Sequence, residues 1–191
     1  QGVEGSFRFL GRTWRICMEY LETVREVPAF TGGEVLEGDL KTLRRKTHQT
    51  IKRVSRDIED RFHFNTAISA VMELVNVLYQ VPRPDKGDRL ALSVIRETIE
   101  TVLLLLNPIV PHFAEELWEH LGQKARLVDW TWPVCDATVA TDEEITLVIQ
   151  VNGKLRNRIV IGADEEEEAV KALALADEKI AKFIEGKQVV K

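Results

Sequence analysis

The first candidates for chemistry in this sequence are basic residues expected on one face of a helix: Lys41, Arg44, Arg45, His48, Lys52 and Arg56. At about 100° per residue, these side chains fall within about 120° of one another. No acidic residue lies between Lys41 and Arg56. Such a stripe can hold a polyanion, because local potential rather than net charge attracts a phosphate backbone. The alternative is pairing with acids of a neighbouring helix, such as Glu97 and Glu100, and the sequence leaves both interpretations open.

A second group of cations follows the dipeptide Asn152-Gly153. Apolar residues alternate on both sides of it, which predicts a β-hairpin with one buried face: Ile145, Leu147, Ile149, Val151, Leu155, Ile159 and Ile161. A two-residue type I′ loop would pair odd with even positions and split this set between the faces. We therefore expect a three-residue loop with Gly153 in the left-handed region at a bulge. The other face would then carry Gln150, Lys154, Arg156 and Arg158, either as phosphate contacts or as an ordinary solvated surface.

The remaining candidates for chemistry are weak. His112, Glu116 and His120 share a helix face at spacings of four, but eight residues separate the histidines by about 12 Å, too far for a common metal. A metal-dependent hydrolase using His112 and His120 is therefore a minor hypothesis. The glycines between Gly33 and Gly38 have P-loop spacing, but Asp39 stands where lysine must reach phosphates. We predict no catalytic residue and no metal site.

The elements that would position these residues are mainly helical. Apolar stripes predict five helices: Gly5 to about Val27, Glu37 or Asp39 to about Arg61, one capped by Asn65 and closed by Pro82, about Asp88 to Leu106, and about Ile109 to Leu121. The stripe of the first helix would be Phe7, Leu10, Trp14, Cys17, Leu21 and Val24. Short connections favour a five-helix bundle over residues 1–122.

An irregular connection is expected over residues 123–144, packed on the bundle through Trp130 and Trp132. Residues 145–191 would form a small α+β domain. In it, the hairpin is followed by a helix that Asp164 caps and that covers the sheet with Val170, Leu173, Ile180, Phe183 and Ile184. Lys187 to Lys191 would begin a last, incomplete strand. The predicted fold class is therefore mainly α, a five-helix bundle followed by a small α+β domain.

Composition limits the class of protein. The chain has 191 residues, 45% of them hydrophobic and 30% charged, with a formal net charge of −5. No run approaches the ~20 apolar residues of a membrane span, and no signal peptide is recognisable. The two cysteines, Cys17 and Cys135, lack neighbours at metal or redox spacing, which fits free thiols in the cytoplasm. Because the chain begins with Gln1 rather than Met, we expect it to be a piece of a longer protein.

Several stretches resemble one family, the bacterial leucyl-tRNA synthetases. Its anticodon-binding helical domain is similar to Gly2-Val3-Glu4-Gly5, Arg8-Phe9-Leu10, Trp14-Arg15, residues 43–51 (LRRKTHQTI), Phe64-Asn65-Thr66-Ala67-Ile68 and Met72-Glu73-Leu74. Residues 107–118, with the segment PHFAEELW, resemble the wider class I group for leucine, isoleucine and valine. The hairpin from Gln150 to Arg156 resembles the start of the small C-terminal domain of the bacterial leucyl enzymes.

This resemblance implies that the parent enzyme joins leucine to its tRNA through an adenylate made from ATP with Mg²⁺. The family's His-Ile-Gly-His and Lys-Met-Ser-Lys-Ser motifs are absent here, so upstream catalytic and editing domains of the same chain would hold the chemistry. This fragment would bind leucine tRNA as a monomer, without membrane contact and without aminoacylating it. The alternative is a helical protein-interaction module whose basic stripe docks an acidic partner.

Overall fold

The computed structural model describes residues 2–59, 62–141, 144–151, 154–162, 167–177, 179, 180 and 183. The chain divides into two compact units, residues 1–141 and 142–191. The first contains α1 (Gly2–Val24), α2 (Gly38–Glu59), α3 (Phe64–Gln80), α4 (Arg89–Leu106), α5 (Pro111–His120), the 3₁₀ turn η1 (Leu127–Asp129) and α6 (Ala137–Ala140). The second contains β1 (Glu144–Val151), β2 (Lys154–Gly162) and α7 (Glu167–Ala176). The mainly helical fold class with a small antiparallel sheet is confirmed.

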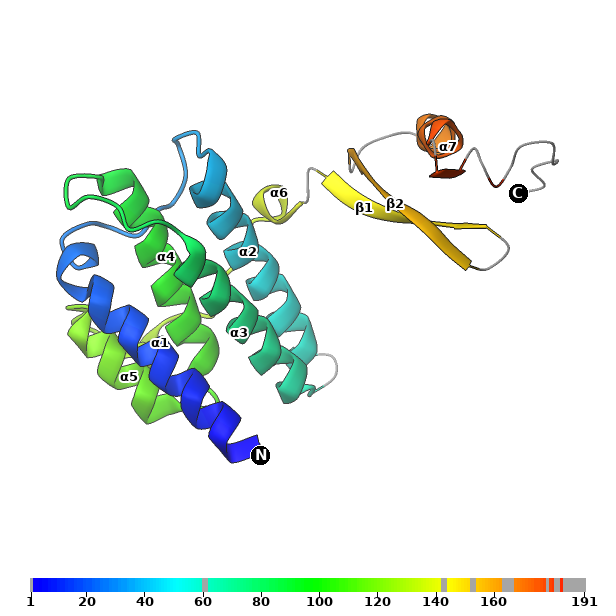
Figure 1. Ribbon diagram of the computed structural model, residues 1–191. Helices are drawn as coiled ribbons and strands as arrows, with labels where there is room; N and C mark the ends of the chain where they lie inside the picture. The colour runs from blue at the N-terminus through cyan, green and yellow to red at the C-terminus, as the bar shows by residue number, and fades with distance from the viewer. Residues whose placement is uncertain are drawn as a thin grey trace. The chain divides into compact units, whose positions relative to one another are not determined.

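The centre of the first unit is α4, which contacts α1, α2, α3 and α5 (Figure 1). Its apolar residues are buried on almost every side, including Ile95, Ile99, Leu103 and Leu106. This agrees with the continuous hydrophobic run in the sequence, since a helix that is apolar all round is buried all round. α4 therefore provides the surface on which the other four long helices pack.

The helix ends follow local signals where a side chain or a glycine fixes them. Asp88 caps α4 by accepting a hydrogen bond from the backbone N–H of Ala91 at 3.0 Å. Gly122 follows α5 with φ of +80°, a conformation that glycine adopts without strain. The predicted cap at Asn65 is wrong, because α3 already begins at Phe64 and His63 precedes it.

Two predictions about α1 also need correction. Phe7 was expected in the core but is 77% exposed. Residues 3–8 carry no buried side chain, so the first turns of α1 extend past its packing partners. α1 also ends at Val24 rather than near Val27, and Pro28 favours this end because its ring would clash with the carbonyl of Val24, four residues earlier, in a continued helix.

The hairpin has the predicted parity only beyond a bulge, and it does not have the predicted loop. Val151 pairs with Lys154, so the loop has two residues, not three, and the register shifts between Ile149 and Gln150. One extra residue on β2, Arg156, makes a bulge there. Odd positions therefore pair with odd positions beyond the bulge, as burial of the apolar set requires. The conformation of Asn152 and Gly153 lies outside the described residues.

α7 lies beside one face of this hairpin (Figure 1). Ile161 on β2 and Ile180 beyond α7 are buried, and Val170 is half-buried. Leu173, expected to be covered on this face, is 49% exposed. The expected cap at Asp164, the expected packing of Ile184 on the sheet and the expected strand over residues 187–191 all lie outside the described residues.

Candidate nucleic-acid interface

α2 carries the predicted basic stripe opposite its core face. Its inward face is buried through Leu43, Thr47, Ile51 and Val54, as the sequence pattern predicted. The basic residues, however, do not form one solvent-exposed stripe. Lys41, Lys52 and Arg56 are exposed, Arg44 and Arg45 are half-buried, and His48 is buried.

Glu97 on α4 accounts for two of these differences. Its Oε2 accepts from Arg44 Nε at 3.3 Å, and its Oε1 lies 3.1 Å from His48 Nε2. The side chains of Arg44 and Glu97 are only 13% and 14% exposed. The Arg44 guanidinium also lies 4.8 Å from the centre of the Phe30 ring. Arg44 and His48 therefore make contacts inside the bundle. This agrees with the alternative interpretation, in which basic residues of α2 pair with Glu97 of a neighbouring helix.

Glu100, the other proposed acid partner, pairs instead with Arg96 at 2.7 Å. Arg96 also donates through Nη1 to the backbone carbonyls of Val24, Arg25 and Val27. These carbonyls lie at and just beyond the end of α1, where helical carbonyls lack partners. Arg96 thus fixes the C-terminal end of α1 rather than contributing to the basic stripe.

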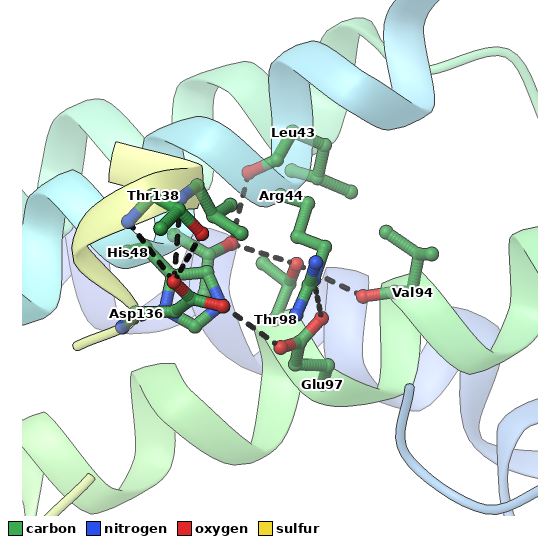
Figure 2. Close-up of polar contacts among 10 residues, drawn as sticks. Leu43, Arg44, His48, Val94, Glu97, Thr98, Asp136 and Thr138 are labelled. Carbon is green, nitrogen blue, oxygen red and sulfur yellow. Dashed lines mark hydrogen bonds and ion pairs between the residues drawn. The ribbon is translucent and has the colours of Figure 1, made fainter. Parts of the chain in front are cut away.

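The connecting segment covers the part of α2 around His48 (Figure 2). The backbone N–H of Asp136 donates to His48 Nδ1 at 3.1 Å. Gln49 Nε2 donates to the carbonyl of Ala140 at 3.1 Å, and Trp132 Nε1 donates to Ser55 Oγ at 2.7 Å. Part of the stripe predicted to face solvent is therefore a packing surface.

The two tryptophans anchor the connection, as predicted. Trp132 packs against the core cluster, and Trp130 contacts Trp118 edge-on with ring centroids 5.0 Å apart.

The sequence analysis missed the contribution of Asp136, which caps α6 by accepting hydrogen bonds from the backbone N–H groups of Thr138 and Val139. The hydroxyl of Thr138 also donates to it, and these bonds lower the pKa of Asp136. An aspartate two residues before a threonine is a local cap signal that could have been recognised.

Two further cations of α2 are paired on another face. Lys46 contacts Glu73 of α3 at 2.7 Å, and Arg53 contacts it at 3.4 Å. The exposed members of the predicted stripe are Lys41 near the start of α2 and, toward its end, Lys52 and Arg56, which lie one helical turn apart. Lys52 and Arg56 form the candidate phosphate-binding pair of the first unit.

On the hairpin, the bulge breaks the predicted row of cations. Arg158 and Gln150 are exposed on the face that also carries Val148 and Leu155. Lys154 pairs with Val151, and residues opposite each other in a ladder share a face, so Lys154 belongs to the other face. The prediction of one shared basic face is therefore wrong.

Arg156 also leaves the predicted outer face. Its guanidinium lies 4.2 Å from the centre of the Phe183 ring, beyond α7, and Arg156 is half-buried. Leu155 takes the exposed position beside it and is 53% exposed. The bulge thus exchanges an apolar and a basic side chain between the two faces, and Arg158 is the candidate phosphate contact that remains outward.

The histidine group on α5 shows no arrangement suited to catalysis. His120 Nε2 lies 3.4 Å from Glu116 Oε1 and contacts the Trp14 ring edge-on. In the part of the chain that the structure describes, no group of three or more His, Cys, Asp or Glu side chains could hold a metal ion. Among the same residues, no helix combines the length and apolar character needed to cross a membrane.

The fold and the surface define a helical bundle with exposed cations on α2, joined to a small hairpin domain. Residues 41–171, more than half of the chain, match the family model of the anticodon-binding domain of tRNA ligases. The chain belongs to this family.

Among the proteins to which the chain is similar are leucine–tRNA ligases. The chain is 60% identical to the one from Syntrophus aciditrophicus and 51% identical to that from Geobacter sp. (strain M21), and each match covers 100% of the chain. It spans only 22% and 23% of the length of those two relatives. A crystal structure of a ternary LeuRS–tRNA–LeuAMS complex from Agrobacterium radiobacter K84 has the same fold, with a TM-score of 0.85 and 27% identity over 98% of this chain and 24% of that one.

Proposed function

We propose that this chain is the part of a leucine–tRNA ligase that holds leucine tRNA. The observation that carries the proposal is the extent of the similarity: 60% identity to a leucine–tRNA ligase covers the whole chain, both units included. The similar structure from Agrobacterium radiobacter is a complex with tRNA, which supports the choice of ligand.

The exposed cations fit contacts to the phosphate backbone rather than to bases. Lys52 and Arg56 on α2 and Arg158 on β2 are exposed and can neutralise phosphates without reading sequence. Because the net charge is −5, this attraction depends on where the cations gather. The ligand would therefore be recognised by shape and charge at these surfaces.

Activation of leucine with ATP and Mg²⁺ belongs, in this proposal, to other parts of the ligase. The described residues contain no group of acidic, histidine or cysteine side chains suited to a metal ion. No step involving ATP or Mg²⁺ is therefore assigned to them.

The test compares two double variants of the chain in binding to a leucine tRNA transcript. Lys52→Gln with Arg56→Gln removes the candidate pair, and we expect roughly tenfold weaker binding at low salt, with the log–log salt slope reduced by about 2. Lys46→Gln with Arg53→Gln is the control on the same helix. It removes the same number of positive charges, but from cations that are paired with the carboxylate of Glu73.

An equal loss of tRNA affinity in the two double variants would show that binding depends on the total charge of the chain. This result would reject the assignment of the surface around Lys52 and Arg56. Wild-type protein that fails to bind tRNA but retains an acidic protein partner in a nuclease-treated lysate would favour the interaction-module alternative.

A further inference from the structure

Two phenylalanine rings are exposed to solvent just before and at the start of α3. Phe62 is 73% exposed, and Phe64, the first residue of α3, is 44% exposed. An apolar side chain exposed singly is ordinary, but here two rings lie within three residues of sequence. Neither ring gains the free energy of full burial in the fold. Phe62 is the more accessible of the two to a ligand.

The backbone holds Phe62 in an unusual conformation. Its φ is +51°, in the left-handed region that a bulky residue rarely adopts. The next residue, His63, is fixed through both of its backbone polar groups. Its N–H donates to the carbonyl of Asp57 at 2.8 Å, and its carbonyl accepts from Thr66 Oγ1 at 2.8 Å. Such conformations persist where neighbouring contacts enforce them, and they are frequent at functional sites.

The hydrogen bond between His63 and Asp57 brings Phe62 close to the exposed cations of α2. Arg56 precedes Asp57 in the last turn of α2 and is exposed, and Lys52 lies one turn earlier. Phe62 precedes His63, so this one hydrogen bond joins the immediate neighbours of the ring and of the cation. Aromatic rings beside cations are typical of surfaces that bind unpaired nucleotides, because the cations hold phosphates while the rings stack on bases.

We propose that Phe62 stacks on an unpaired base of leucine tRNA whose neighbouring phosphates contact Arg56 and Lys52. The inference rests on the proposed function, in which this part of α2 contacts the tRNA backbone. Stacking uses the face of a base, which every nucleotide has, so the contact needs no particular sequence. It does need a base outside a double helix, because paired bases are already stacked on one another. The segment bound here is therefore a loop or bulge of the tRNA rather than a stem.

The experiment measures the affinity of the full chain for a leucine tRNA transcript over a range of salt concentrations. Phe62→Ala should weaken binding about tenfold, as expected for the loss of one stacked base. Its log–log salt slope should equal that of the wild type, because an uncharged ring releases no counterions. Arg56→Gln should instead reduce the slope by about 1. The slope thus separates stacking from charge.

Two further substitutions of Phe62 distinguish stacking from a general apolar contact. Phe62→Tyr keeps an aromatic face and should bind within about twofold of the wild type. Phe62→Leu keeps apolar bulk without a ring and should bind as weakly as Phe62→Ala.

Phe7→Ala is the matched control, because Phe7 is a phenylalanine of α1 that is 77% exposed. Its loss should leave both the affinity for tRNA and the salt slope unchanged. Since Phe7 and Phe62 are both exposed, all of these variants should melt within about 2 °C of the wild type.

Affinity of Phe62→Ala within twofold of the wild type would overturn the inference and favour a protein as the partner of these rings; the proposed function would still stand. The inference is also overturned if Phe62→Leu binds like the wild type, if Phe7→Ala binds as weakly as Phe62→Ala, or if the loss of affinity accompanies a lower melting temperature. Wild-type protein that does not bind leucine tRNA at all would reject the proposed function and the inference together.

Discussion

At the scale of single residues, the carboxylate of Glu97 holds two of the predicted stripe residues of α2, Arg44 and His48, inside the bundle. Helical spacing predicts which side chains share a face, and it placed Arg44 and His48 with Lys52 and Arg56. Helical spacing alone does not show which side chains of a neighbouring helix contact that face. The sequence could therefore identify the candidate basic residues. Only the packing of α4 and of the connection shows which of them contact the bundle and which are exposed to solvent.

The cysteines give a direct test of the core around α1. Burial raises the pKa of the Cys17 thiol to about 12, and Cys135 is half-buried in the connection. At pH 8, we expect a thiol reagent such as DTNB to modify Cys135 first and Cys17 more than about a hundredfold more slowly, because the latter must await unfolding. A Cys135→Ala variant isolates the slow reaction. Rapid modification of Cys17 in the native protein would contradict the packing of α1.

Glu73 should make a small, pH-dependent contribution to stability. A hydrogen bond from Lys46, aided by the charges of Lys46 and Arg53, lowers its pKa below the usual 4.5. Its contribution is therefore present above pH 4.5 and is lost as the pH falls through the folded-state pKa. Because the side chain is 48% exposed, solvent screening limits the contribution to less than about 1 kcal/mol.

Chemical denaturation of Glu73→Gln tests this at two pH values. The variant should be slightly less stable than wild type at pH 7, and the difference should shrink as the pH falls below 4.5. A difference that stays constant or grows on acidification would show that the ion pairs with Lys46 and Arg53 are not its cause.

At the scale of elements, some local signals predict helix ends well, although the cap expected at Asn65 is wrong and the cap at Asp136 was missed. Asp88 and Gly122 end their helices as the sequence indicates, because a cap acts within one turn. In the hairpin, the parity of the apolar residues and the Asn152-Gly153 dipeptide pointed to different loops. The structure has the two-residue loop that the dipeptide favours, and a bulge at Arg156 restores the predicted parity only beyond it, so that Leu155 is exposed. A bulge has no simple sequence signal, so the exchange of faces between Leu155 and Arg156 could not be predicted.

Asp177 should stabilise the second unit mainly through its hydrogen bonds. Oδ1 accepts from the backbone N–H groups of Lys179 and Ile180, each at 3.1 Å, and Oδ2 accepts from Asn157 Nδ2 at 2.7 Å. Asp177→Ala removes a cap and a contact between the hairpin and the helical segment, and it should cost about 1–2 kcal/mol.

Hydrogen exchange of β2 amides measures this loss, and Glu168→Ala, which removes an exposed acid of α7, is the matched control. Faster exchange in Asp177→Ala only is the expected result. Equal exchange in both variants would mean that Asp177 does not hold the hairpin.

At the scale of the whole molecule, the division into a helical bundle and a hairpin unit followed from the change of hydrophobic period along the sequence. The family followed from motifs spread over both units and agrees with the match over residues 41–171. What the sequence could not supply is the exposed charge pattern, which depends on long-range packing. The cations available to a ligand are fewer than the sequence suggested, and those of the hairpin do not share one face.

The most direct test of the central claim is a salt titration of the wild-type chain with leucine tRNA. If Lys52, Arg56 and Arg158 contact phosphates, the logarithm of the binding constant should fall linearly with the logarithm of salt concentration, with a slope of about −2 to −3. A saturable affinity with such a slope would support the assignment of these surfaces to tRNA. Binding that is independent of salt, or no binding at about 50 mM salt, would contradict it.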